Sequence, residues 1–275
     1  MNREDAYNLF GEMVSVSSKQ ILASIEDMGL KISYKADNTV VTKADEDIGC
    51  ALVELAKKQG FQAISEESYQ NIDIVKSGNY IIIDPIDGTL AFIEHLKNSS
   101  KDNPAFSPNL GEGYDYALLI GIVEDGKPRF GCCYNYVTGE EIYIDSVGDI
   151  TRKGIRRDKF EADFARYVDR RSEDPINLKL SQDPSVSTYT FGSLGLGSLY
   201  AQLNEHKSAV VAHFPQQNGL WDILPACVAA EFTGATILDG SGNKISYTDY
   251  LLIPKGVVLY TGDKFSWIKN ELQKP

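Results

Sequence analysis

The sequence predicts an α/β protein made of two halves, an α+β amino-terminal half and an α/β carboxyl-terminal half. Two patterns lead to this prediction. The first is a long stretch of apolar residues at helical spacing, followed by short runs rich in Val, Ile and Tyr that indicate a meandering sheet. The second is an alternation of strand-like and helix-like segments further on. We therefore divide the chain into residues 1–150 and residues 151–275, and we expect the functional site between them.

The amino-terminal half begins with a long helix, because apolar residues recur at helical spacing from Tyr7 to Met28, just before Gly29. Residues 45–58 are predicted to form a second helix. Strands are predicted near Phe61 and Tyr80 and over residues 116–123, 129–136 and 141–145. Two helices followed by a run of strands make this half α+β.

The carboxyl-terminal half alternates strands with helices. Strands are predicted over residues 187–192, 209–214 and 256–260, and helices over residues 197–204 and 222–232. Pro225 is compatible with the first turn of the second helix, where its missing N–H costs no hydrogen bond. The basic segment 151–171 precedes these elements and is predicted to be a solvated charged face, in preference to a site for a phosphate or a partner subunit.

Two aspartates follow a strand-like apolar run. Residues 80–83 favour a buried strand, which Pro85 and Gly88 are expected to end. Asp84 and Asp87 then lie at its carboxyl edge, where ligands gather in sheets that are covered by helices. Carboxylates at such an edge suit a hard divalent cation. An ordinary Asp-Gly turn is the alternative, and for this motif alone it is the more common one.

A helix is predicted to start directly after these aspartates, over residues 89–96. Asp87 would precede or cap this helix. The N–H groups of Gly88 and Thr89 would then be free to face an anion. A metal ion and a phosphate would therefore meet at one point.

Further acids lie at the ends of other elements. Glu66 follows the strand-like run 61–65, and Asp222 precedes an apolar helix. Taken singly, an Asp in the position of Asp222 is favoured as a helix N-cap over a metal ligand by about two to one. Clustered acids without counter-ions repel one another and are costly to bury, so a bound metal ion resolves the cluster as a whole.

At these acids the chain resembles the inositol monophosphatase superfamily, the magnesium-dependent, lithium-sensitive phosphatases that include bisphosphate nucleotidases and some fructose-bisphosphatases. The resemblance rests on four motifs in the family's order: Val-Thr-x-x-Asp ending at Asp45, Ser-Glu-Glu-Ser at residues 65–68, Asp-Pro-Ile-Asp-Gly-Thr at residues 84–89, and Trp-Asp at residues 221–222. A glycine turn at residues 192–195 resembles the family's substrate-side turn. The match covers most of the chain from Lys35 to about Gly240. It implies a layered αβαβα sandwich and a possible homodimer.

A haloacid-dehalogenase enzyme is the competing kind of phosphatase. Its Asp-x-Asp-Gly-Thr signature carries a nucleophilic Asp that forms an aspartyl-phosphate. One residue separates the two acids in that signature, whereas Pro85 and Ile86 separate them here. We therefore expect no covalent intermediate.

The resemblance implies a role for each matched residue. Two or three Mg²⁺ ions would be bound by Glu66, Asp84, Asp87, Asp222 and the carbonyl of Ile86. Thr89 and Glu66 would orient a metal-activated water for in-line attack on phosphorus, with Asp45 holding the Thr89 hydroxyl. The amides of Gly88 and Thr89 would hold the phosphate. Glu67 matches a position one step removed from the metal and is left out of the ligand set.

The residues that would contact the rest of the substrate follow the family less closely. By resemblance, Ser193 and Gly195 are expected at the substrate side. Leu90 and Ala91 match neither the Lys-Glu of the nucleotidase branch nor the Thr-Asn of the inositol branch. The phrase Asn-Gly-Leu-Trp-Asp at residues 218–222 is closer to the nucleotidase branch. Inositol monophosphate and 3′-phosphoadenosine 5′-phosphate therefore both stay open as substrates.

The function predicted from the sequence is that of a Mg²⁺-dependent phosphomonoesterase acting on a small phosphorylated metabolite. The alternative is a catalytically silent relative that binds metal and a phosphorylated ligand as a sensor or scaffold. Asp45, Glu66 and Thr89 argue against the alternative, because a silent protein needs no water-orienting threonine. The altered Leu90 and Ala91 keep it open.

Composition agrees with an enzyme and limits its partners. The chain has 275 residues, 43% of them hydrophobic, and its formal net charge of -12 argues against binding to a nucleic-acid polymer. We find no signal-peptide core and no apolar run that could cross a bilayer, so we expect a cytoplasmic protein without a membrane partner. The four cysteines are expected to be reduced core thiols. Residues 98–113, rich in Asn, Ser, Pro and Gly, form either a lid or a surface insertion.

Overall fold

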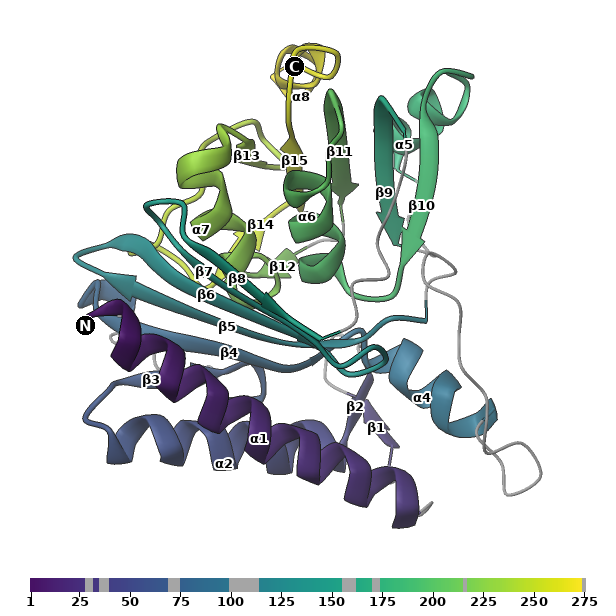
Figure 1. Cartoon of the computed structure of the whole chain (residues 1–275). Helices are drawn as coiled ribbons and strands as arrows, with labels where there is room; N and C mark the ends of the chain where they lie inside the picture. Colours follow the sequence, from purple (N-terminus) through teal and green to yellow (C-terminus); the bar gives the residue numbers. More distant parts are fainter. Residues whose placement is uncertain are drawn as a thin grey trace.

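The computed structural model describes residues 1–27, 32–34, 40–68, 75–98, 114–154, 162–169, 174–214 and 217–273. Its elements form five layers in the order helices, sheet, helices, sheet, helices (Figure 1). The predicted α/β class and the layered αβαβα sandwich are therefore confirmed. The predicted lid or insertion lies outside the described residues from position 99 to position 113.

The first layer consists of α1 (Arg3–Asp27) and α2 (Lys43–Lys58), which pack against each other and under the first sheet (Figure 1). Both helices are predicted from the sequence. Phe10 and Met13 of α1 and Ile48 and Leu52 of α2 are fully buried in one core with the sheet. Burying such side chains is worth about 1.5–3 kcal/mol each, which fixes the helices on this face.

The first sheet has six strands in the order β3-β4-β5-β6-β7-β8. Their bounds are Ala63–Ser65, Tyr80–Asp87, Ala117–Glu124, Lys127–Asn135, Glu140–Asp145 and Ile150–Lys153. β3 is parallel to β4, and every later neighbour is antiparallel, which confirms the predicted meander. β8 belongs to this sheet although it crosses residue 150; the division of the chain at that residue stays a prediction.

Strand β4 is longer than predicted. The sequence predicted its end at Ile83, whereas the strand continues through Pro85 to Asp87. The pairing with β5 shifts register between Asp84 and Asp87, and such an irregularity accommodates a proline that cannot donate to the ladder. Asp84 therefore lies inside the strand and Asp87 ends it.

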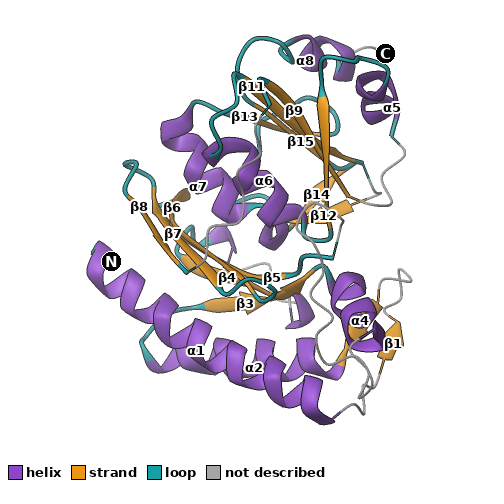
Figure 2. Cartoon of the chain, turned by 45° about the vertical axis from the view of Figure 1, so that its right-hand side comes forward, coloured by secondary structure: helices purple, strands orange, loops and turns teal. Residues whose placement is uncertain are grey.

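The middle layer consists of α6 (Leu194–Leu203) and α7 (Leu224–Thr233), between the two sheets (Figure 2). The sequence placed the start of the second of these helices at Asp222, but that residue closes the short 3-10 turn η2 (Leu220–Asp222) and the helix begins two residues later. α7 approaches the first sheet closely, because a Cβ at Gly131 would lie 3.0 Å from Pro225 Cα. Glycine in the sheet makes this approach possible.

The second sheet has five strands in the order β10-β9-β11-β15-β13. Their bounds, in chain order, are β9 Phe164–Asp169, β10 Ser187–Phe191, β11 Ser208–His213, β13 Thr236–Asp239 and β15 Val257–Tyr260. The outer helices α5 (Pro175–Ser181) and α8 (Trp267–Leu272) cover its far face. The remaining elements are β1 (Ile32–Tyr34), β2 (Val40–Thr42), the 3-10 turn η1 (Glu66–Ser68), α4 (Thr89–Asn98), β12 (Gln217–Gly219) and β14 (Leu252–Pro254).

Two further predictions need correction. The basic segment 151–171 was predicted to be a charged face, but its residues 164–169 form strand β9, which lies between β10 and β11 with Ala165 and Tyr167 buried. Residues 155–161 and 170–171 of this segment lie outside the described residues. Four core thiols were predicted; Cys132, Cys133 and Cys227 are buried, whereas Cys50 is exposed on α2. All four are free thiols, as predicted. Among the described residues, no helix is both long and apolar enough to span a membrane.

Candidate metal and phosphate site

Three of the predicted acids converge at one end of the first sheet. Glu66 begins η1 directly after β3, Asp84 lies in β4, and Asp222 closes η2. β3 and β4 are parallel neighbours in which Ser65 pairs with Ile83, so the next residues, Glu66 and Asp84, lie side by side. The turn η2 packs against β4 and adds Asp222. One carboxylate oxygen of each acid lies within 4.8 Å of the others.

The electrostatics of this cluster favour a cation. Burial raises the pKa of Asp84 well above its usual range, and the neighbouring carboxylates of Glu66, Asp87 and Asp222 raise it further. The pKa of Asp222 is also raised well above its usual range, first by burial and then by Glu66 and Asp87. An all-oxygen donor set of this kind suits Mg²⁺, whose charge would offset the repulsion between the acids.

Asp87 is placed differently from the cluster of three. Asp87 precedes α4, which is one of the two predicted placements, and its carboxylate accepts three hydrogen bonds from the start of α6. Oδ2 accepts from Ser193 Oγ at 2.5 Å and from the Gly195 N–H at 2.7 Å, and Oδ1 accepts from the Leu194 N–H at 3.3 Å. Burial raises the pKa of Asp87 to about 7, although these donors oppose the shift. Ser193 and Gly195, expected at the substrate side, thus direct their polar groups to this carboxylate.

Thr89 and Asp45 are in direct contact. Asp45 Oδ1 accepts from the Thr89 hydroxyl at 3.1 Å, and the same hydroxyl lies 3.1 Å from the carbonyl oxygen of Ile86. Asp45 Oδ2 accepts from the N–H and the hydroxyl of Thr42, the residue that caps α2. Burial raises the pKa of Asp45 to about 6, against the lowering effect of the Thr42 bonds. The start of α2 therefore fixes the first residue of α4.

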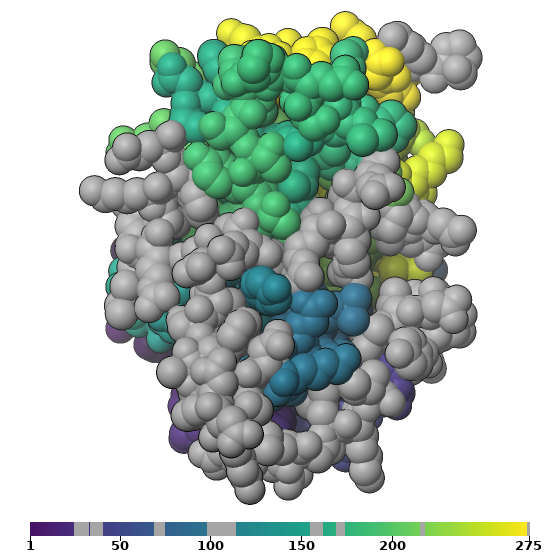
Figure 3. All heavy atoms as spheres, turned by 90° about the vertical axis from the view of Figure 1, so that its right-hand side faces the viewer, coloured from purple at the N-terminus to yellow at the C-terminus, as the bar shows by residue number. Residues whose placement is uncertain are grey.

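Gly88 joins the end of β4 to the start of α4. Its φ is +95°, and a Cβ at this position would lie 2.8 Å from the Gly192 carbonyl oxygen, so only glycine fits. Its own carbonyl accepts from the Phe92 N–H and closes the first turn of α4. Figure 3 faces this side of the molecule, with α4 in blue below the green atoms of β10. Gly88 and Thr89 thus lie at a helix amino terminus beside Asp87, where an anion is favoured.

Two site residues were missed from the sequence. The Asn218 side chain is buried, lies 3.0 Å from His213 Nδ1, and hydrogen-bonds to Asp222, which lowers the pKa of that acid. The hydroxyl of Tyr136 donates to the carbonyl of Pro85 at 2.9 Å and holds the irregular part of β4. Asn218 stands in the phrase at residues 218–222 that was compared with the nucleotidase branch, but its contacts, like that of Tyr136, depend on the tertiary fold.

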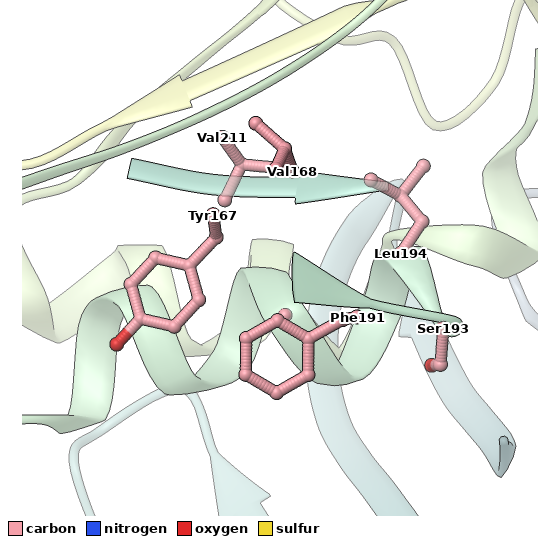
Figure 4. A pocket seen from close by; sticks show the side chains of 7 residues that line it. Tyr167, Val168, Phe191, Ser193, Leu194 and Val211 are labelled. Carbon is pink, nitrogen blue, oxygen red and sulfur yellow. The ribbon is translucent and has the colours of Figure 1, made fainter. Parts of the chain in front are cut away.

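A small cavity lies beside Ser193 (Figure 4). It is lined by Tyr167, Val168, Phe191, Ser193, Leu194, Gly197 and Val211. Its volume is about 10 Å³, which is room for about one water molecule. A sugar ring or a nucleobase does not fit, so this cavity is not the substrate pocket.

Residues 8–265 match the sequence model of the Inositol monophosphatase family. Among curated proteins, the fructose-1,6-bisphosphatase/inositol-1-monophosphatase of Archaeoglobus fulgidus is 26% identical over 154 residues. That alignment covers 54% of this chain and 52% of the relative, so the chain spans about half the length of the curated relative it matches.

Solved structures share the fold over nearly the whole chain. A staphylococcal inositol monophosphatase-1, solved as an inhibitory complex soaked in LiCl, has a TM-score of 0.70 at 15% identity, covering 100% of this chain and 95% of that one. An IMPase/NADP phosphatase complexed with Mg²⁺ and phosphate has a TM-score of 0.68 at 18% identity, covering 93% and 90%. At these identities the likeness establishes the fold.

Proposed function

Because the chain belongs to the inositol monophosphatase family, as its motifs predict, we propose that it is a Mg²⁺-dependent phosphomonoesterase that hydrolyses a small phosphorylated metabolite. The observation that carries the proposal is the convergence of Glu66, Asp84 and Asp222 within 4.8 Å. These acids come from three separate elements, and burial and mutual repulsion raise the pKa values of Asp84 and Asp222 strongly. A bound divalent cation would offset that repulsion.

Two or three Mg²⁺ ions would be held by Glu66, Asp84, Asp87, Asp222 and the carbonyl of Ile86. When bound, Mg²⁺ lowers the pKa of a water molecule and offsets the negative charge of a phosphate ester. The acid cluster is consistent with this ligand set in charge, in donor type and in its position at a strand edge. Support for Mg²⁺ and phosphate also comes from the related IMPase/NADP phosphatase, which was solved with both.

Thr89 is suited to orient the attacking water. Its single hydroxyl proton points to Asp45 or to the Ile86 carbonyl, so the oxygen keeps its lone pairs to accept a hydrogen bond from water. Glu66 would accept the second proton of that water and leave an oxygen lone pair directed at phosphorus. The amides of Gly88 and Thr89, at the start of α4, would bind the phosphate oxygens.

The sensor alternative is less well supported. Asp45 is buried and accepts a hydrogen bond from the Thr89 hydroxyl. Burying an acid costs free energy, and a sensor has no attacking water for this hydroxyl to orient. Inositol monophosphate and 3′-phosphoadenosine 5′-phosphate remain the two substrates to compare. Ser193 and Gly195 contact Asp87, on the side where the substrate would bind. The homodimer stays a prediction from the resemblance.

Phosphate release by the purified protein tests the proposal. The substrates are inositol 1-phosphate, 3′-phosphoadenosine 5′-phosphate and fructose 1,6-bisphosphate, each with Mg²⁺, with Mg²⁺ plus Li⁺, and with EDTA. We expect turnover that requires Mg²⁺, that Li⁺ suppresses, and that Asp84→Asn lowers by about a thousandfold, a loss of about 4 kcal/mol in transition-state stabilisation. Turnover that persists in EDTA would contradict the metal mechanism, and Mg²⁺ binding without any turnover would favour the sensor.

A further inference from the structure

Ser193 links the start of helix α6 to the end of strand β4, beside the acid cluster. Its side chain is fully buried, and its hydroxyl lies 2.5 Å from Asp87 Oδ2, a residue 106 positions away in the sequence. The same hydroxyl accepts the Leu196 N–H at 3.1 Å and so caps α6. Because the N–H of Leu196 can only donate, the hydroxyl proton is directed to the carboxylate.

The rest of the first turn of α6 supports the same carboxylate. The Gly195 N–H donates to Oδ2 at 2.7 Å, and the Leu194 N–H lies 3.3 Å from Oδ1. A Cβ at Gly195 would lie 2.6 Å from the carbonyl oxygen of Asp222, so this turn also touches the segment that carries another acid of the cluster. The turn is therefore packed between two proposed metal ligands.

The two oxygens of Asp87 are not equivalent. Oδ2 receives two short hydrogen bonds, whereas Oδ1 receives one long one. A carboxylate oxygen with two strong donors has little capacity left for a cation, while the other oxygen keeps lone pairs available. Without the hydroxyl of Ser193, the carboxylate would lose the side-chain contact that fixes its rotation.

We propose that Ser193 is a positioning residue for metal binding, which locks Asp87 Oδ2 and so presents Oδ1 to the ion. This inference rests on the proposed function and deepens it, since it replaces a substrate contact of Ser193 by a role in ordering a ligand. Partners that orient metal ligands typically contribute 10–100-fold to metal affinity. Ser193 would act on metal binding, before any step of phosphate hydrolysis.

The test measures Mn²⁺ affinity of the metal-free protein by the electron paramagnetic resonance signal of free Mn²⁺, with Mg²⁺ as competitor. We expect Ser193→Ala to weaken Mn²⁺ binding at least tenfold. Asp174→Ala is the control, because Asp174 caps the outer helix α5, where its carboxylate accepts the Asn177 N–H at 2.8 Å. It should bind Mn²⁺ within twofold of the wild type, even where its thermal stability falls.

A double-mutant cycle separates positioning from general damage. In an Asp87→Ala background, the further change Ser193→Ala should leave Mn²⁺ affinity unchanged within twofold, because the group it positions is gone. An equal loss in both backgrounds would overturn the inference, and so would wild-type affinity in Ser193→Ala. If the alanine variant does not fold, Ser193→Cys, whose thiol is a weaker donor, should give an intermediate loss. Failure of the wild type itself to bind Mn²⁺ would instead overturn the proposed function.

Discussion

At the scale of single residues, burial dominates the chemistry of the site. The pKa of Asp45 is raised to about 6 and that of Asp87 to about 7, in both cases first by burial. Each carboxyl group therefore holds its proton more tightly in the folded protein than in the unfolded chain, where the pKa of Asp is about 3.9. In the metal-free protein at neutral pH, these buried acids therefore lower the free energy of unfolding.

This cost predicts an unusual pH dependence of stability. Between about pH 4 and pH 7 the folded state binds more protons than the unfolded state, so the free energy of unfolding rises as the pH falls through that window. In EDTA we expect the melting temperature at pH 5 to exceed that at pH 7.5 by about 5 °C, with each kcal/mol worth about 2–4 °C. Calorimetry checks this.

Saturating Mg²⁺ provides the contrast for this prediction. A bound cation stabilises the ionised acids, so the rise in melting temperature towards pH 5 should disappear when Mg²⁺ is present. A melting temperature that falls steadily from pH 7.5 to pH 5 in EDTA would contradict our assignment of buried, metal-dependent acids.

At the scale of elements, helix α6 allows a matched comparison of two variants, because two of its glycines have different surroundings. A Cβ at Gly195 would meet Leu119 Cδ1 at 2.2 Å and the Asp222 carbonyl oxygen at 2.6 Å, whereas the nearest atom to a Cβ at Gly197 lies at 3.4 Å, an ordinary contact. We expect Gly195→Ala to lower the free energy of unfolding by about 2 kcal/mol or more through overpacking. Urea unfolding measures the loss.

Gly197→Ala is the matched control in the same helix. Alanine is the better helix former by about 0.8–1 kcal/mol, so this variant should be as stable as the wild type or more stable. Similar losses of stability in both variants would show that the contacts of Gly195 with the segment of Asp222 are not the cause.

The elements also show what the sequence reveals and what it does not. The long helices α1 and α2 are predicted from apolar residues at helical spacing, and strands β4 and β5 from continuous apolar runs, which the fold buries on both faces. Strand β9 is missed because Arg166 and the surrounding basic residues mask an alternation in which Ala165 and Tyr167 are buried. Strand β4 extends past Pro85 because of a register shift that depends on β5.

The site follows the same division. The acids Glu66, Asp84 and Asp222 could be grouped from their places at strand and helix ends and from the motifs that surround them. The hydrogen bonds from Ser193 and Gly195 to Asp87 could not, because they span more than a hundred residues. Local pattern identifies which residues carry chemistry, while tertiary packing decides which groups orient them.

At the scale of the whole molecule, a second buried network joins the first sheet to the middle helices. The guanidinium of Arg152 in β8 donates to Glu140 Oε1 in β7, and the hydroxyl of Tyr200 in α6 donates to Glu140 Oε2 at 2.7 Å. Glu140 is only 2% exposed. Because the start of α6 also donates hydrogen bonds to Asp87, α6 is attached both to this network and to the proposed metal site.

Tyr200→Phe should therefore destabilise the whole protein. Removing a donor from a buried, charged acceptor costs about 1–3 kcal/mol, which urea unfolding followed by circular dichroism can measure. Tyr143→Phe is the control, because its hydroxyl donates to the partly exposed Glu141 within one strand. We expect about 0.5 kcal/mol or less for that variant, and equal losses for the two would argue against a special role of the network.

The central claim is that the converging acids bind divalent cations beside a phosphate. It is tested most directly by crystals grown with Mn²⁺ and phosphate and measured for anomalous scattering. We predict anomalous peaks at direct coordination distance from Glu66, Asp84 and Asp222, with phosphate at the amides of Gly88 and Thr89. The absence of a peak among these acids at saturating Mn²⁺, or ordered Mn²⁺ only elsewhere on the protein, would contradict the account.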